Sequence, residues 1–180
     1  TIRQVLGKLV DEGLVSRVHG KGTFVAQEKV PTRSPTYHGV RAQLEQQGYS
    51  TRTEMQSSGE VPADARLARQ LDVPVGTPLS MVERLRYAED TPISLHKSFV
   101  PMPLAPGLLE HDLTGRQLCQ VLAGDYGLNM VYVHESLESL TPTPTELSAL
   151  RVRRGIPLLL LEQRISDQSR RVFEYTRIKF

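Results

Sequence analysis

The sequence predicts an α+β protein in which a short helix and a basic β-ribbon precede an antiparallel sheet with helices. Three observations predict this fold. Apolar residues recur at helical spacing in residues 1–12, a glycine-containing turn separates two β-prone runs in residues 14–26, and strand-like and helix-like stretches alternate over residues 37–180. The 180 residues, of which 39% are hydrophobic, can form one sizeable core and a small appendage.

The first 26 residues have the pattern of a helix followed by a ribbon. Positions 2, 5, 6, 9 and 10 are apolar, and Gly13 is a typical residue for ending a helix. The turn His19-Gly20-Lys21-Gly22 contains two glycines, which supply the positive φ that a tight hairpin needs. A short amphipathic helix and a basic ribbon indicate the recognition helix and wing of a winged helix-turn-helix. Such a helix enters a DNA major groove, and the wing tip approaches phosphates or a minor groove.

The stretch TIRQVLGKLVDEGLVSRVHGKGTFVA closely resembles the end of the DNA-binding domain of GntR-family bacterial transcription regulators. The family pattern reads roughly T-[VI]-R-x-A-L-x-x-L-x-x-E-G-L-[LV]-x-R-x-x-G-x-G-T-F-V, and the only departure is Val5 in place of alanine. The alternative, an ordinary helix and hairpin with a solvated lysine, is weaker because many positions match at fixed spacing. The resemblance implies double-stranded operator DNA as a partner and contacts from these residues: Thr1, Arg3, Gln4, Arg17, His19, Gly20, Lys21, Gly22 and Thr23.

Basic charge is concentrated at this end of the chain. Residues 1–33 carry a net charge of +3 and the remainder carries −1, which suits phosphate contact by the first part. Residues 27–36 contain two prolines and little periodic apolarity, which predicts an extended linker. We therefore expect an incomplete winged helix-turn-helix domain over 1–26, a linker over 27–36 and a second domain over 37–180. Because the sequence opens in mid-helix without a methionine, we expect an internal portion of a longer regulator.

The composition argues against several classes of protein. A single cysteine, Cys119, rules out a disulfide within the chain and suits the reducing cytoplasm. No apolar run approaches the length of a membrane span, so we expect a cytoplasmic protein without a membrane partner. His111 and His134 form no metal-like cluster with each other or with Cys119, so neither a metal nor a cofactor is expected.

Helices and strands alternate from residue 37 onward. Pro62 marks the start of one helix, Thr114 caps another, and Thr143-Pro144-Thr145-Glu146 has the pattern of a capping box. Polar turns at 88–91 and 168–171 indicate hairpins. Together these signals predict an antiparallel sheet with helices mainly on one side. The predicted helices cover 38–47, 62–71, 113–123 and 143–150, and the predicted strands cover 50–60, 79–87, 92–100, 130–140, 158–167 and 172–180.

Residues 37–180 resemble the UTRA effector domain of the HutC-type branch of GntR regulators, a domain that shares the fold of chorismate lyase. Four segments carry the likeness: A-R-Q-L with V-G-T-P in 68–78, E-R-L-R-Y-A with two later prolines in 83–101, E-L-S-A-L with G-I-P-L-L in 146–159, and V-F-E-Y in 172–175. The resemblance implies a homodimeric transcription regulator, a repressor rather than an activator, whose operator binding is controlled by a small anionic metabolite.

Two other functions are alternatives to a transcription regulator. A chorismate lyase-like enzyme acting on a small carboxylate is the alternative, because the same fold hosts catalysis. The wing counts against it, since an enzyme has no use for that element and fold alone does not imply function. A purely architectural DNA-binding protein would leave the paired arginines described next unexplained.

Arg84 and Arg86 are two residues apart on a predicted strand, so their side chains point to the same face. Neighbouring guanidinium groups repel each other unless an anion bridges them, which a carboxylate or phosphate does bidentately. The alternative is a solvated sheet face on which the two pair with Glu83 or Glu162. A buried, solvent-free pair at Arg84 and Arg86 would overturn the sensing role but not the DNA-binding role.

The UTRA resemblance implies further members of the effector site. Glu174 matches a glutamate that accepts hydrogen bonds from the effector, and its alternative role is an ion pair with Arg84 or Arg86. His96 stands where relatives have an acidic residue, while Gln117 and Gly39 lack hydroxyls that help to bind phosphate in relatives. A carboxylate effector is therefore at least as plausible as a phosphorylated sugar. The expected effector-binding residues are Arg84, Arg86, Glu174, His96, Gln117, His38 and Gly39.

Overall fold

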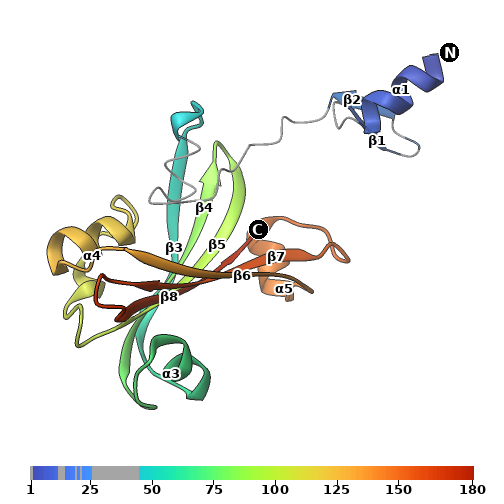
Figure 1. Cartoon of the computed structure of the whole chain (residues 1–180). Coiled ribbons are helices and arrows are strands. Elements are labelled where there is room, and N and C mark those ends of the chain that lie inside the picture. Colours follow the sequence, from blue (N-terminus) through green and yellow to red (C-terminus); the bar gives the residue numbers. More distant parts are fainter. Residues whose placement is uncertain (1, 12–14, 19, 21, 26–44) are drawn as a thin grey trace. The chain divides into compact units, whose positions relative to one another are not determined.

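The computed structural model describes residues 2–11, 15–18, 20, 22–25 and 45–180. The chain divides into two compact units, Thr1–Thr36 and Tyr37–Phe180 (Figure 1). The domain boundaries expected at residues 26 and 36 lie outside the described residues and stay a prediction. The same holds for most of the helix expected over 38–47, of which residues 45 and 46 are described and helical.

The first unit contains the helix and the ribbon that the sequence predicts. Helix α1 spans Ile2–Asp11, and strands β1 (Val15–Val18) and β2 (Gly22–Val25) pair antiparallel. Gly20 and Gly22 have φ values of +75° and +121°, a backbone conformation that glycine adopts without strain. The two glycines of the turn therefore have the conformational role that the sequence indicates.

The second unit is built on a six-stranded antiparallel sheet with the strand order β3-β4-β5-β8-β7-β6 (Figure 1). All six predicted strands are confirmed, with ends shifted by one or two residues. Tight turns join β4 to β5 and β7 to β8, and β5 pairs with β8 at the centre of the sheet. The strands are β3 (Thr51–Pro62), β4 (Pro78–Ala88), β5 (Thr91–Pro101), β6 (Tyr132–Leu140), β7 (Leu158–Ser166) and β8 (Val172–Lys179).

Two predicted helix starts are wrong because side-chain caps begin the helices later. Pro62 is the last residue of β3, and helix α3 (Ala65–Leu71) begins after Asp64, whose carboxylate accepts a hydrogen bond from the Leu67 amide at 2.7 Å. Thr114 caps no helix. Its amide and hydroxyl donate to Asp112 Oδ1, at 3.0 and 2.6 Å, in a separate turn.

The remaining helices lie on both sides of this turn in the chain. A short 3₁₀ helix, η1 (Leu108–Glu110), precedes it, and helix α4 (Leu118–Tyr126) begins after it, with Gln117 at the N-cap position. The predicted capping box is confirmed at helix α5 (Pro144–Leu150). The Thr143 amide donates to Glu146 Oε2 at 2.9 Å, and the Glu146 amide donates back to Thr143 Oγ1 at 3.4 Å.

Helices cover both faces of the sheet, which corrects the expectation that they lie mainly on one side. On β4 and β5, successive side chains point to opposite faces. Leu79 and Phe99 pack against α3, and Leu85 packs against α5, on what we call the α3/α5 face. Val82 and Val100 lie on the opposite face and pack against α4, so we call it the α4 face.

Because Leu122 of α4 is fully buried among the residues of the α4 face, Leu122→Ala leaves a cavity there. We expect the free energy of unfolding to fall by about 2–5 kcal/mol in urea titrations. The control is Val75→Ala, since Val75 is 69% exposed, and it should change stability by less than about 0.5 kcal/mol. Equal effects of the two substitutions would contradict the packing of α4 on the sheet.

Candidate effector site

A group of buried polar residues interrupts the apolar packing of the α4 face. The register of the sheet places Arg84 opposite His96, Arg86 opposite Ser94, and Ser98 opposite Thr176. Buried polar groups are costly unless they are paired, so such a group in a core indicates a functional site. Its members, from β4, β5 and β8, are Arg84, Arg86, Ser94, His96, Ser98, Glu174 and Thr176.

The two arginines share a face as predicted, but neither pairs with the carboxylates first considered. Glu83 forms an ion pair with Lys97 at 3.6 Å, and Glu162 accepts from Arg177 Nε at 3.0 Å. Both glutamates lie on the α3/α5 face, where strand alternation separates them from Arg84 and Arg86. The solvated face proposed as the alternative is therefore wrong.

The arginine pair is buried in the described part of the chain, where Arg84 is 3% and Arg86 is 9% exposed. This burial counts against the sensing role as the arginines stand, and an effector could reach them only if the cover over the pair opened. The buried Nε of Arg84 has no hydrogen-bond partner, and Arg84 forms no direct ion pair with any described residue. Burial lowers the pKa of Arg84, while the charges of Glu174 and Cys119 oppose that shift.

Glu174 is the carboxylate of this group. Burial raises its pKa, because a carboxylate loses hydration in the core, and a hydrogen bond from Ser98 opposes the shift more than the attraction of Arg84 and Arg86 does. The electrostatic attraction is therefore present, but no direct ion pair joins Glu174 to Arg84. Glu174 lies on the same face as the two arginines, and its expected role as a hydrogen-bond acceptor for the effector stays a prediction.

His96 lies between charged neighbours but is itself neutral. Burial, followed by repulsion from Arg86 and Arg84, holds the pKa of His96 well below its ordinary value. Its Nε2 is 2.8 Å from the Ser94 hydroxyl, and either atom can be the donor, depending on the tautomer. His96 can therefore offer hydrogen bonds to a ligand, but no charge to attract one.

The first turn of α4 lies over this group. The Cys119 thiol donates to Gln117 Oε1 at 3.8 Å. Burial raises the pKa of the thiol, Glu174 adds to the increase, and Arg86 and Arg84 oppose it. The start of α4 thus brings Cys119 close to the buried arginines and glutamate, with Gln117 hydrogen-bonded to Cys119.

Sequence reasoning did not select Ser94, Ser98 and Thr176. The two serine hydroxyls line the α4 face of β5, and the Ser98 and Thr176 hydroxyls are 2.9 Å apart. The signal was present, since residues 94, 96 and 98 are all polar at strand spacing within a mainly buried strand.

For several predicted site residues, the described part of the structure does not test the predicted role. Thr1, His19, Lys21, His38 and Gly39 lie outside them, and Arg3 and Arg17 are placed only as members of α1 and β1. At the other predicted DNA contacts, Gln4 is exposed on α1, and Gly20, Gly22 and Thr23 are exposed in the ribbon.

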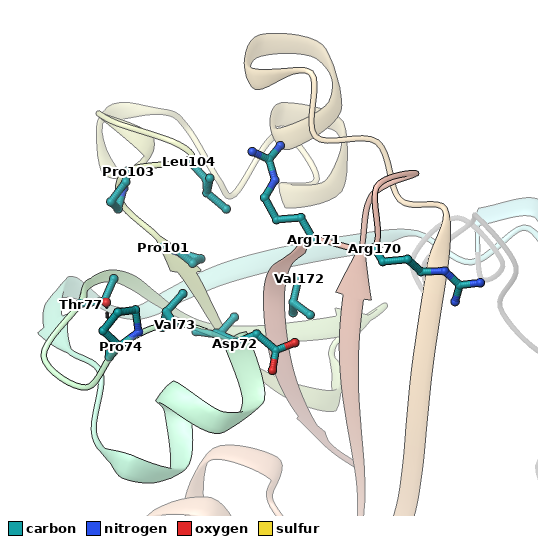
Figure 2. A pocket seen from close by; sticks show the side chains of 11 residues that line it. Asp72, Val73, Pro74, Thr77, Pro101, Pro103, Leu104, Arg170, Arg171 and Val172 are labelled. Atoms are coloured by element: carbon teal, nitrogen blue, oxygen red, sulfur yellow. Dashed lines mark hydrogen bonds between the residues drawn. The ribbon is translucent and has the colours of Figure 1, made fainter.

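A separate cavity of about 440 Å³ lies at the end of the sheet where β5 finishes and β8 begins (Figure 2). Its floor includes Pro101 and Val172, and Arg170 and Arg171 border it. Both arginines are engaged: Arg171 pairs with Asp167, at 3.0 Å, and Arg170 stacks on Tyr132. Neither Arg84 nor Arg86 lines this cavity, so it is distinct from the buried polar group.

Within the described ranges, no three histidine, cysteine or acidic side chains come together in an arrangement that could hold a metal ion. In the same ranges, none of the helices combines the length and apolarity that crossing a membrane requires.

Residues 46–180 match the UTRA domain family, which covers the sheet and every residue of the buried polar group. The chain belongs to the UTRA family. This match and the relatives below confirm the GntR-family, HutC-type membership indicated by the motifs. The six-stranded sheet and its helices therefore form a UTRA domain.

Known relatives of this UTRA protein are transcriptional regulators rather than enzymes. The histidine utilization repressor of Pseudomonas aeruginosa is 29% identical over 168 residues, which cover 91% of this chain and 65% of that protein. The transcriptional repressor NagR of Bacillus subtilis is 24% identical over 177 residues, covering 98% of this chain and 72% of NagR. The chain thus spans about two thirds to three quarters of these relatives.

The crystal structure of PhnF from Mycobacterium smegmatis is similar over 99% of this chain and 78% of PhnF. The TM-score is 0.79 and the sequence identity 26%. This similarity confirms the predicted fold class, an α+β arrangement around a six-stranded antiparallel sheet.

The buried His96 predicts a pH dependence of stability. Its pKa is lowered in the folded protein, whereas a histidine in the unfolded chain has a pKa of about 6.5. As the pH falls through that value, the unfolded state takes up the proton first, so the stability present at higher pH is lost. We expect the wild type to lose more stability than His96→Gln between pH 7.5 and pH 5.5 in urea titrations. Parallel stability curves for the two proteins would contradict a neutral, buried His96.

Proposed function

We propose that this UTRA protein is a metabolite-responsive, DNA-binding transcriptional repressor whose UTRA domain binds a small anionic effector at the buried polar group. The main support is Arg84, a buried guanidinium with an unpartnered Nε beside a second arginine. The charge of a bound anion would stabilise both groups, because hydrogen bonds to ionised partners are strong in a desolvated site. The repressor names of the relatives support the direction of control.

The charges around the site indicate the chemistry of the effector. Arg84 and Arg86 carry two positive charges, Glu174 offers at most one negative charge, and His96 is neutral. Arg84 forms no direct ion pair with a described residue, so its positive charge is the one that an anion would offset. Ser94, Ser98, Thr176 and His96 add hydrogen-bonding groups that suit hydroxyl, amino or ring-nitrogen atoms. A carboxylate and a phosphate both satisfy these conditions.

Because the arginines are buried, binding requires the cover over the α4 face to open. The first turn of α4 contributes Gln117 and Cys119 to that cover, so an anion held by Arg84 and Arg86 would favour a different position of this turn. An effector that prefers one arrangement shifts the population toward it, and the linker would transmit the change to the DNA-binding unit. The regulator would act in the cytoplasm as a homodimer on a two-fold symmetric operator.

The arginine site can be tested by thermal unfolding with a panel of small carboxylates and phosphates, including phosphosugars, imidazole acids such as urocanate, and chorismate. At an effector concentration of about 100 times Kd we expect Tm to rise by about 5–10 °C in the wild type. Arg84→Met should abolish this rise, because the bidentate partner is lost. The matched control is Arg153→Met on the exposed surface, which should retain it.

Two outcomes would overturn the sensing proposal. One is a rise that Arg84→Met retains in full, which would place the anion elsewhere. The other is conversion of chorismate or another carboxylate into product, which would favour the lyase-like enzyme.

The wing can be tested by the salt dependence of DNA binding. Removing one phosphate contact lowers the slope of log Kobs against log salt by about 1, so we expect that change for Lys21→Ala on the regulator's own upstream DNA. Gel shifts between 50 and 200 mM salt measure it, with Arg153→Met as the control. An unchanged slope would remove Lys21 from the DNA contacts, and no binding by the wild type at low salt would overturn the DNA-binding role.

A further inference from the structure

The cavity between the end of β5 and the start of β8 has the size and lining of a site for a small molecule. Its volume of about 440 Å³ lies within the range of known ligand pockets. Most of its lining side chains are apolar, among them Leu71, Val73 and Leu104 (Figure 2). Because water is poorly accommodated by such a wall, the cavity favours a hydrophobic group.

The walls of this cavity are rigid. Pro74, Pro101 and Pro103 line it, and the ring of each proline fixes its backbone φ angle. The Thr77 hydroxyl donates to the Pro74 carbonyl oxygen at 2.7 Å, and the Leu104 amide donates to the Pro101 carbonyl oxygen at 2.9 Å. An empty apolar space loses packing contacts and usually costs stability. Walls that resist collapse therefore indicate a space kept for a ligand.

The cavity lies where the two sides of the core meet. Leu104 packs against the apolar cluster of the α4 face, whereas Leu71 and Val172 belong to the cluster that includes α3. A molecule in the cavity would contact residues of both clusters. Because this contact surface exists only in the folded chain, the bound molecule would raise the stability of the second unit.

One positive charge at the border of the cavity is not offset within the described part of the chain. Asp72 pairs with Arg164 at 2.7 Å. Arg171 pairs with Asp167 at 3.0 Å. Arg170 stacks on an aromatic ring but forms no ion pair with a described residue. A carboxylate is the matching partner, because it accepts hydrogen bonds from a guanidinium and carries a single negative charge.

We propose that this cavity is a second ligand site, which takes a small amphipathic carboxylate. The apolar part of the ligand would fill the space beside Val73 and Leu104, and its carboxylate would lie at the border, next to Arg170. A phosphate dianion matches the one unoffset charge less well than a carboxylate does. No residue of the buried polar group lines the cavity, so this second site does not depend on the proposed effector site.

Calorimetric titration of the 180-residue chain with 4-phenylbutyrate tests the site and the class of its ligand. We expect a Kd below about 1 mM, since this probe is small and buries one apolar group. Its neutral amide, 4-phenylbutyramide, should bind about three- to fivefold more weakly, because it lacks the charge that faces Arg170. Acetate carries the charge without the apolar group and should show no binding at the same concentrations.

Two substitutions separate the cavity from the charge. Val73→Phe places a larger side chain in the cavity, so the Kd of 4-phenylbutyrate should rise by about tenfold or more. The matched control is Val75→Phe, which alters a side chain that is 69% exposed and does not line the cavity. Arg170→Gln, in an exposed turn, should weaken the carboxylate by about three- to fivefold and leave the amide unchanged. Arg153→Gln is the matched control for the lost charge.

Three results would overturn the second ligand site. They are the absence of binding up to about 10 mM 4-phenylbutyrate, equal affinity of Val73→Phe and Val75→Phe, and equal affinity of the wild type for the carboxylate and the amide. Thermal unfolding checks that Val73→Phe is folded, and if it is not, the exposed Arg170→Gln variant alone decides the result.

A further variant separates this site from the proposed effector site. Arg84→Met should bind 4-phenylbutyrate as the wild type does, because Arg84 does not line the cavity. Loss of binding in Arg84→Met would place the probe at the buried polar group and overturn the second ligand site. Binding that persists in Arg84→Met but is lost in Val73→Phe supports the second site, whether or not the effector panel stabilises the wild type.

Discussion

The burial of two guanidinium groups within one sheet face is the constraint on which the rest of this site depends. The elements that exclude water from Arg84 and Arg86 also bury Glu174 and His96, so these groups interact in a low dielectric. The same environment keeps His96 neutral, raises the pKa of Glu174 and raises the pKa of the Cys119 thiol. Burial is the largest cause of each of these pKa shifts, and neighbouring charges add to the shifts of His96 and Cys119.

The two faces of the sheet use charge in different ways. On the α3/α5 face, Glu162 accepts hydrogen bonds from Arg66, Arg177 and Tyr175, at 2.5, 3.0 and 2.7 Å. Burial and this glutamate raise the pKa of Tyr175 to about 12. Those charges are paired within the chain and hold α3 to the sheet. On the α4 face, the Nε of Arg84 is unpartnered, which is the pattern of a group arranged for a ligand rather than for stability.

Sequence patterns predicted the strands well because each signal was local. Period-two alternation, polar turns at 88–91 and 168–171, and the capping box at Thr143 depend on residues close together in the chain. The errors came from local competition that residue type alone does not decide. Asp64 and Asp112 each accept hydrogen bonds from nearby amides, and these bonds moved the starts of α3 and α4 toward the C-terminus.

By itself, the sequence determined the order of the strands along the chain, the glycine turn of the ribbon, the family and the shared face of Arg84 and Arg86, because spacing along a helix or strand sets direction. Only the tertiary structure decided which face each helix covers, that Glu83 and Glu162 point away from the arginines, and that His96 is neutral between them. Burial and electrostatic partners depend on residues brought together from distant strands. No local pattern encodes those neighbours.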